Sequence, residues 1–228
     1  MAACLCIFDI DRTLTAKQSA AWCPGTLQTD EWDSAYGGGN LIFSAAAQNI
    51  GATFCRACHL GIITAGDATG PWSEERGLLW GLLSALRPGL GPASEGDWSD
   101  VSSVHSPMVL HAPDGWKQES VWPILSYFTS RVGVTVPDED VYFFDDRSSN
   151  VLGFRGTAWN ARQVSCMSRD GPVGLCGAVL SEIVAEKGVR TCEGFEEGRH
   201  ASNCPQGYYL CPPNVRQLAD FCDADADC

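Results

Sequence analysis

Acidic and hydroxyl side chains follow several apolar runs of the sequence, at the point where each run ends. They are Asp9 and Asp11 after residues 3–8, Thr64 after residues 60–63, and Asp145 and Asp146 after residues 140–144. Short apolar runs of this kind predict buried strands of a parallel sheet with helices on both faces. Because ligands of open α/β sheets bind at the carboxyl ends of the strands, we expect these side chains to converge on one crevice.

The four carboxylates of this set would repel one another and raise each other's pKa. A divalent cation removes that conflict, and hard oxygen ligands completed by water and a substrate phosphate are typical of Mg²⁺. Lys117 stands at the start of a predicted helix and is one of only three lysines. A lysine in this crevice would balance charge and bind phosphate as a point charge. The residue types therefore indicate chemistry on a phosphorylated substrate.

In this order, the residues resemble the four motifs of the haloacid dehalogenase (HAD) superfamily. The matching segments are Asp9-Ile10-Asp11-Arg12-Thr13 for the first motif (DxDxT after an apolar strand), Ile62-Ile63-Thr64 for the second, Lys117 for the third, and Phe143-Phe144-Asp145-Asp146 for the fourth in its paired-aspartate form. Each segment falls at a predicted strand end or helix start. The resemblance covers residues 4–165 and leaves the end of the chain unmatched.

The resemblance implies a Mg²⁺-dependent phosphatase that hydrolyses a phosphate monoester. Asp9 would be the nucleophile that forms an aspartyl-phosphate, and Asp11 the general acid that then becomes the base. Thr64 and Lys117 would also belong to the catalytic set, and the phosphoryl group would be bound by Thr64, Ala65 and Lys117. The metal ligands would be Asp9, the backbone carbonyl of Asp11, Asp145 and Asp146.

Asp11 distinguishes the branches of this family. The dehalogenases lack an aspartate at this position, because no leaving alkoxide needs a proton there. Arg12 departs from the Gly, Asp or Asn that is commoner at its position, and we expect its side chain to point away from the phosphate. Two alternatives stay open: a phosphotransferase or mutase that passes the same aspartyl-phosphate to another acceptor, and a non-catalytic phosphate-binding module on the same fold.

Alternating strands and helices are predicted around the motifs, which indicates an α/β fold with a central parallel sheet. The family resemblance implies that this fold is a Rossmann-like three-layer sandwich. Further strands are expected at residues 107–110 and 160–165. Helices are expected over residues 40–50, 73–86, 115–131 and 175–187. Residues 88–106 are rich in Gly, Pro and Ser and predict a loop, while residues 16–39 predict an irregular flap.

The intervals between the motifs are too short for a large cap domain. The first interval leaves room for the flap alone, and a helix, a loop and a strand use most of the second. The chain is thus similar to cap-less family members of the magnesium-dependent phosphatase group, in which an Asn resembling Asn150 follows the paired Asp. We expect a HAD-like catalytic domain over residues 1–187 and a Cys-rich acidic extension over residues 188–228. Side chains expected near the mouth of the site are Trp22, Trp32, Trp72, His111 and Trp116.

Cysteine is abundant, with 12 in the chain and 5 of them in residues 188–228. Disulfides, a zinc site or free thiols all fit this Cys-rich tail, and a disulfide connectivity does not follow from sequence. Cys55-Arg56-Ala57-Cys58-His59 matches the pattern of covalent haem attachment. Haem is not expected there, because it would disrupt the buried strand that follows.

The charge balance excludes several classes of partner. The 28 acidic residues against 15 basic ones give a net charge of −13, which argues against nucleic-acid binding and against docking on anionic membranes. No apolar run is long enough for a membrane span, and the first residues do not read as a signal peptide. A cytoplasmic location is favoured, while the cysteines keep a secreted or organellar one, after removal of a leader, open. The expected partner is a phosphorylated small molecule or phosphoprotein, and a homo-oligomer in which a neighbour forms the lid stays open.

Overall fold

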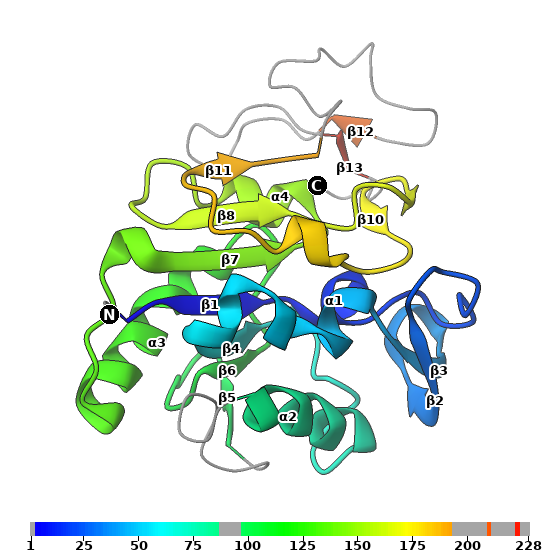
Figure 1. Ribbon diagram of the computed structural model, residues 1–228, viewed down its shortest axis with the longest axis horizontal. Coiled ribbons are helices and arrows are strands. Elements are labelled where there is room, and N and C mark those ends of the chain that lie inside the picture. Colours follow the sequence, from blue (N-terminus) through cyan, green and yellow to red (C-terminus); the bar gives the residue numbers. More distant parts are fainter. Residues whose placement is uncertain (1–2, 87–96, 193–208, 211–221, 224–228) are drawn as a thin grey trace.

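The computed structural model describes residues 3–86, 97–192, 209–210 and 222–223. Its centre is a seven-stranded sheet in the order β11-β8-β7-β1-β4-β6-β5 (Figure 1). Every neighbouring pair in this sheet is parallel. The strands are β1 (Leu5–Phe8), β4 (His59–Ile63), β5 (Trp98–Asp100), β6 (Met108–Leu110), β7 (Val141–Asp145), β8 (Asn160–Gln163) and β11 (Val189–Arg190).

Alternate residues of the strands build two cores, one on each face of the sheet. In β1, Cys6 and Phe8 belong to one core, and Leu5 and Ile7 to the other. The first core is covered by α1 (Ala45–Gln48) and α2 (Glu74–Leu86), and the second by α3 (Val121–Tyr127) and α4 (Ser148–Leu152). Both faces are apolar, as parallel sheets require. The predicted α/β sandwich with a central parallel sheet is therefore confirmed.

The predicted strands at the motifs are present, with ends shifted by a residue or two. The apolar run at 60–63 lies in β4, the run at 107–110 in β6, and the run at 160–165 in β8. Helix α2 occupies the predicted interval 73–86. A short 3-10 turn (Lys117–Ser120), α3 and a wider turn (Phe128–Val132) together form the helical stretch predicted over 115–131.

The flap is a β-hairpin and not an irregular excursion. Strand β2 (Leu27–Asp33) pairs antiparallel with β3 (Gly39–Phe43), and the hairpin lies beyond the carboxyl end of β1 (Figure 1). The helix predicted over 40–50 is also wrong, because the first part of that segment is β3. Burial of the side chains at the end of β3 and pairing with β2 outweigh local helix preference. Helix α1 then begins after Ser44, whose hydroxyl accepts a hydrogen bond from the Ala47 amide at 3.1 Å.

The helix predicted over 175–187 is absent, and only a 3-10 turn (Leu180–Glu182) forms there. The backbone of this segment bonds to other parts of the chain: the Ala178 amide donates to the Thr13 carbonyl, and the Ala46 amide donates to the Ala178 carbonyl. Gly177 has φ +70°, and a β-carbon on it would lie 2.4 Å from the Thr15 carbonyl oxygen. These tertiary bonds satisfy groups that a helix would pair internally.

Several short strands were not predicted from the sequence. The predicted loop 88–106 contains β5, and residues 88–96 of it lie outside the described part of the chain. A short hairpin is made by β9 (Arg169–Asp170) and β10 (Val173–Gly174), and β12 (Tyr209–Leu210) pairs antiparallel with β13 (Cys222–Asp223). The predicted boundary at residue 187 falls just before β11, which pairs with β8 at the edge of the central sheet.

Four disulfides cross-link the described residues: Cys4–Cys58, Cys6–Cys55, Cys23–Cys176 and Cys166–Cys192. Cys6 of β1 and Cys4 just before it are linked to the segment that precedes β4. Both cysteines of the haem-like pattern are therefore in disulfides, which leaves them no thiol for haem or zinc. In the Cys-rich tail, Cys192 is linked back to the body of the domain, and the side chains of the other tail cysteines lie outside the described residues. Among the described residues, no helix has the length and apolarity to cross a membrane.

Candidate active site

Lys117 lies between two buried carboxylates at the carboxyl edge of the sheet. Its Nζ donates to Asp9 Oδ1 and to Asp145 Oδ2, each at 2.7 Å. Asp9 follows β1 and Asp145 ends β7, which are neighbouring strands, so the topology itself brings the two carboxylates together. All three side chains are buried. Burial alone would lower the pKa of Lys117, but the Asp145 and Asp9 carboxylates raise it above its ordinary value, which keeps the ammonium charged.

Asp145 is held by a second set of contacts. Its carboxylate accepts hydrogen bonds from the Arg147 amide at 2.8 Å and from Asn150 Nδ2 at 3.0 Å. Asn150 Nδ2 also donates to Asp114, and Asn150 Oδ1 accepts from the Gly115 amide. These bonds fix the carboxylate of Asp145 toward Lys117 and link it to the loop before Lys117.

Asp146 completes a cluster of three carboxylates. Oxygen atoms of Asp9, Asp145 and Asp146 lie within 4.8 Å of one another, and Asp146 Oδ2 accepts from the Gly174 amide at 2.5 Å. Burial, followed by the charge of Asp145, raises the pKa of Asp146 above its ordinary value. Burial also raises the pKa of Asp9, against the lowering effect of Lys117. The cluster is therefore a set of oxygen ligands that could hold a metal ion.

Asp11 lies in the turn after β1, separated from Asp9 by one residue. Residues Ile10–Leu14 form this turn, in which Arg12 takes a left-handed conformation with φ +62°. Burial and the nearby Asp33 carboxylate raise the pKa of Asp11 to about 6. A carboxyl group with this pKa both donates and accepts a proton near neutral pH.

The Arg12 side chain is buried and packs against the flap. Its guanidinium lies 4.3 Å from the centre of the Tyr36 ring and donates to the Gly174 carbonyl at 3.3 Å. Gly174 is the same residue whose amide binds Asp146. Arg12 thus connects the first-motif turn, the flap and the β9–β10 hairpin.

Thr64 follows β4 and is buried beside Asp11 in the wall of a pocket. Its amide donates to the Val109 carbonyl and its carbonyl accepts from the Ala112 amide, so the backbone at this position is fixed by β6. Ala65, which was expected to bind the phosphoryl group, is exposed and does not line the pocket. The predicted Asp9, Asp11, Thr64, Lys117, Asp145 and Asp146 are otherwise all found at this edge of the sheet.

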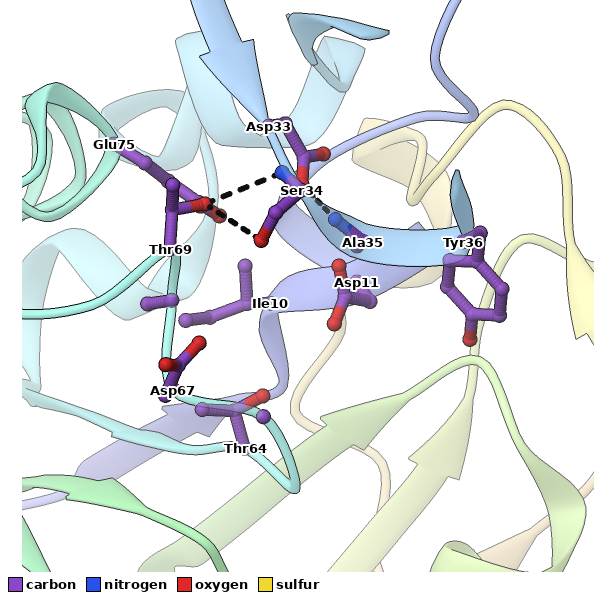
Figure 2. Close-up of a pocket in the computed structure, with 12 residues that line it drawn as sticks. Ile10, Asp11, Asp33, Ser34, Ala35, Tyr36, Thr64, Asp67, Thr69 and Glu75 are labelled. Carbon is purple, nitrogen blue, oxygen red and sulfur yellow. Dashed lines mark hydrogen bonds between the residues drawn. The ribbon is translucent and has the colours of Figure 1, made fainter. Parts of the chain in front are cut away.

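The pocket that Asp11 and Thr64 line has a volume of about 220 Å³, and Figure 2 shows the side chains around it. It lies between the first-motif turn, the flap and the loop before α2. Its polar walls carry Asp11, Asp33, Ser34, Tyr36, Thr64, Asp67, Thr69 and Glu75. The aromatic and His side chains expected at the mouth do not line it. His111 instead pairs with Asp100 at 2.7 Å.

Sequence reasoning missed Asp33, Tyr36 and Glu75 as pocket residues and gave Asp114 no role. Asp114 lies three residues before Lys117, in the loop that leads to it, and contacts it at 3.9 Å. Its closeness to Lys117 in the sequence was a usable signal. Glu75 carried no such signal, because acidic residues are common in the first turn of a helix, where the helix dipole stabilises their charge. Asp33 and Tyr36 lie on the hairpin that was predicted as irregular.

Comparisons with known proteins found no matching family model, curated protein or solved structure.

Proposed function

We propose that this chain is a Mg²⁺-dependent phosphatase of the HAD-like type, which hydrolyses a phosphate monoester through an aspartyl-phosphate on Asp9. The observation that carries the proposal is the buried Lys117 ammonium between Asp9 and Asp145, with Asp146 in the same cluster. A carboxylate that attacks an anionic phosphate needs fixed positive charge beside it. The resemblance of the four motifs supports the same assignment.

The chemistry of the donor set fits a divalent cation. Three buried carboxylates share one ammonium, so the cluster keeps an excess of negative charge that a cation would offset. Burial is the main cause of the raised pKa values of Asp9 and Asp146, and the neighbouring carboxylates raise them further. Asp9, Asp145, Asp146 and the backbone carbonyl of Asp11 would hold Mg²⁺. When bound, the ion supplies positive charge that stabilises the transferring phosphoryl group.

The reaction divides between two aspartates. Asp9 Oδ1 accepts from Lys117, and the other oxygen of that carboxylate attacks phosphorus while the bond to the leaving oxygen breaks. Asp11 gives its proton to the leaving oxygen, and the alcohol departs. Asp11 then takes a proton from water, which attacks the phosphorus of the aspartyl-phosphate, releases inorganic phosphate and restores Asp9.

The test is turnover of an aryl phosphate such as p-nitrophenyl phosphate in the presence of Mg²⁺. We expect Asp9→Asn to lower kcat by at least about a thousandfold, because an amide is no nucleophile for this step. Asp140→Asn is the matched control, since Asp140 lies before the opposite end of β7 and pairs with Lys187 at the surface. Undiminished turnover in Asp9→Asn would exclude the nucleophile, and turnover that survives a chelator would exclude the metal.

We also infer that the protein works in an oxidising compartment. Four disulfides among the described residues favour the secreted or organellar alternative over the cytoplasm, since cytosolic thiols are kept reduced. Labelling of the cysteines with a maleimide in intact cells measures this, and full labelling without reductant would contradict it.

A further inference from the structure

The side of the site that receives the leaving group follows from the position of Asp11. This step rests on the proposed function. A general acid must lie within hydrogen-bond reach of the oxygen that it protonates. The leaving oxygen is therefore beside Asp11, and the rest of the leaving group lies in the pocket that Asp11 and Thr64 line.

That pocket is lined by acidic side chains. The carboxyl groups of Asp11, Asp33, Asp67 and Glu75 surround it, and none of the described residues in its wall is basic (Figure 2). They come from three segments: the first-motif turn, the flap, and the stretch from the loop after β4 into α2. Convergence of acidic groups from separate segments gives the pocket a negative potential.

Two of these carboxyl groups are buried without a direct ion pair to another described residue. Glu75 is 2% exposed, and its carboxylate accepts a hydrogen bond from the Thr69 hydroxyl. Asp33 is 1% exposed and accepts from Gln18 Nε2 at 2.5 Å and from the Ala35 amide at 2.8 Å. All these donors are neutral, and neither carboxylate forms an ion pair with another described residue. Burial accordingly raises the pKa of both groups, and a buried carboxylate of this kind is stabilised when a cation pairs with it.

We propose that the pocket selects phosphate monoesters whose leaving group carries an ammonium group. The ammonium would form the direct ion pair that Glu75 and Asp33 lack among the described residues, whereas an anionic leaving group would be repelled. A neutral polyol would gain hydrogen bonds but no charge pairing. The volume of about 220 Å³ lies below the range of about 300–1,000 Å³ that is typical for drug-sized ligands, which favours a small amino alcohol over a protein segment.

The experiment compares two esters of the same size, 2-aminoethyl phosphate and propyl phosphate, with Mg²⁺ at pH 9, above the pKa of about 8 that burial gives Glu75. We expect kcat/KM to be at least about tenfold higher for the amino ester. The attraction between two unit charges at a partly buried site is larger than a tenfold ratio requires. In Glu75→Gln the ratio of the two kcat/KM values should fall several-fold, because the amino ester loses the charge of Glu75 and propyl phosphate has no charge to pair with it. Glu74→Gln, a neighbouring exposed residue, should retain the wild-type ratio.

A second variant and a second measurement keep the two proposals separable. Asp67 is an exposed residue of the pocket wall, so Asp67→Asn should fold. This variant should also lower the ratio of the two kcat/KM values, and it replaces Glu75→Gln in the test if that variant does not fold. Binding of both esters to Asp9→Asn by calorimetry gives a readout without turnover, and the amino ester should bind more tightly. Turnover of both esters at equal kcat/KM would overturn the pocket proposal and leave the phosphatase intact. Absence of any turnover would contradict the proposed phosphatase activity. Equal binding of the two esters to Asp9→Asn would in that case overturn the pocket proposal as well.

Discussion

Lys117 is a buried lysine whose charge is kept by its surroundings. An isolated ammonium in this position would lose its proton, because burial disfavours the charged form. The two carboxylates at 2.7 Å reverse that tendency. The same contacts orient Asp9, so under the proposed function one side chain would both hold the nucleophile in place and supply the positive charge that an incoming phosphate needs. Scarcity of lysine made this residue easy to identify in the sequence.

Glu75 gives a pH dependence of stability with a defined sign. Burial raises its pKa from 4.5 to about 8 in the folded protein, so the folded state holds a proton that the unfolded state has lost. This contribution to stability is complete below about pH 4.5 and is lost as pH rises through about 8, with a slope of up to ~1.4 kcal/mol per pH unit. In Glu75→Gln the contribution no longer depends on pH. Urea unfolding should therefore show the variant gaining stability relative to the wild type as pH rises from 5 to 8.

The exposed Glu74 provides the comparison for that measurement. Glu74→Gln should follow the wild-type stability in parallel across the same pH range. Parallel curves for Glu75→Gln as well would mean that Glu75 is ionised in the folded protein, contrary to the effect expected from its burial.

At the scale of single residues, the sequence predicted the residues of the carboxylate cluster but few of those in the pocket. Asp9, Asp145 and Lys117 stand directly at the ends or starts of elements with clear apolar patterns, so their convergence follows from a parallel sheet. Asp33 and Glu75 have no such mark. Their role depends on the fold of the flap against the loop before α2, and no local pattern records that packing.

Some elements of the fold follow from the local sequence pattern, and others depend on contacts with distant parts of the chain. Strands β1, β4 and β7 are continuous apolar runs, which favour a buried strand in any packed α/β protein. The hairpin β2–β3 carries exposed and polar residues in its outer strand, so its pattern is weak. The segment 175–187 has helical spacing, yet its amide and carbonyl groups bond to the first-motif turn and to α1. Sequence periodicity cannot reveal bonds between distant segments.

Gly177 tests the importance of that tertiary attachment. It combines φ +70° with a distance of 2.4 Å between the position of a β-carbon and the Thr15 carbonyl oxygen. Gly177→Ala should therefore destabilise the fold by about 2–4 kcal/mol, from the left-handed conformation and from displaced backbone. It should also lower kcat, because the displaced carbonyl belongs to the chain that leaves the Asp11 turn.

Gly188→Ala is the matched control for this comparison. Gly188 has φ +83°, but nothing lies within 4 Å of its β-carbon position. Gly188→Ala should lower the free energy of unfolding by about 1 kcal/mol, the cost of the left-handed conformation alone. Its kcat should stay at the wild-type value. Equal losses in urea unfolding for the two variants would show that the close approach to Thr15 contributes nothing.

For the whole molecule, the proposed function requires an acidic protein to bind an anionic substrate. The net charge of −13 opposes phosphate at long range, and the positive charges of Lys117 and of the proposed cation would offset that repulsion locally. The acidic pocket gives the remaining negative charge a use, since it would attract a leaving group of opposite sign. Global charge and local site thus favour the same class of substrate, a small phosphate ester that also carries a positive charge.

The disulfides connect distant parts of this molecule, and their effects on stability should differ with the length of chain that they close. Cys23–Cys176 spans 153 residues and ties the start of the flap to the segment after β10, while Cys166–Cys192 spans 26. If a cross-link acts mainly by restricting the unfolded chain, its contribution grows with the logarithm of the enclosed length. The double variant Cys23→Ser/Cys176→Ser should then lose about 1.5 kcal/mol more than Cys166→Ser/Cys192→Ser, within a typical range of ~2–5 kcal/mol for each. Urea unfolding without reductant measures both losses, and full reduction should bring the wild type below either variant. A larger loss for the shorter loop would instead assign the stabilisation to native contacts around β8 and β11, and the chain-restriction account of this fold would have to be abandoned.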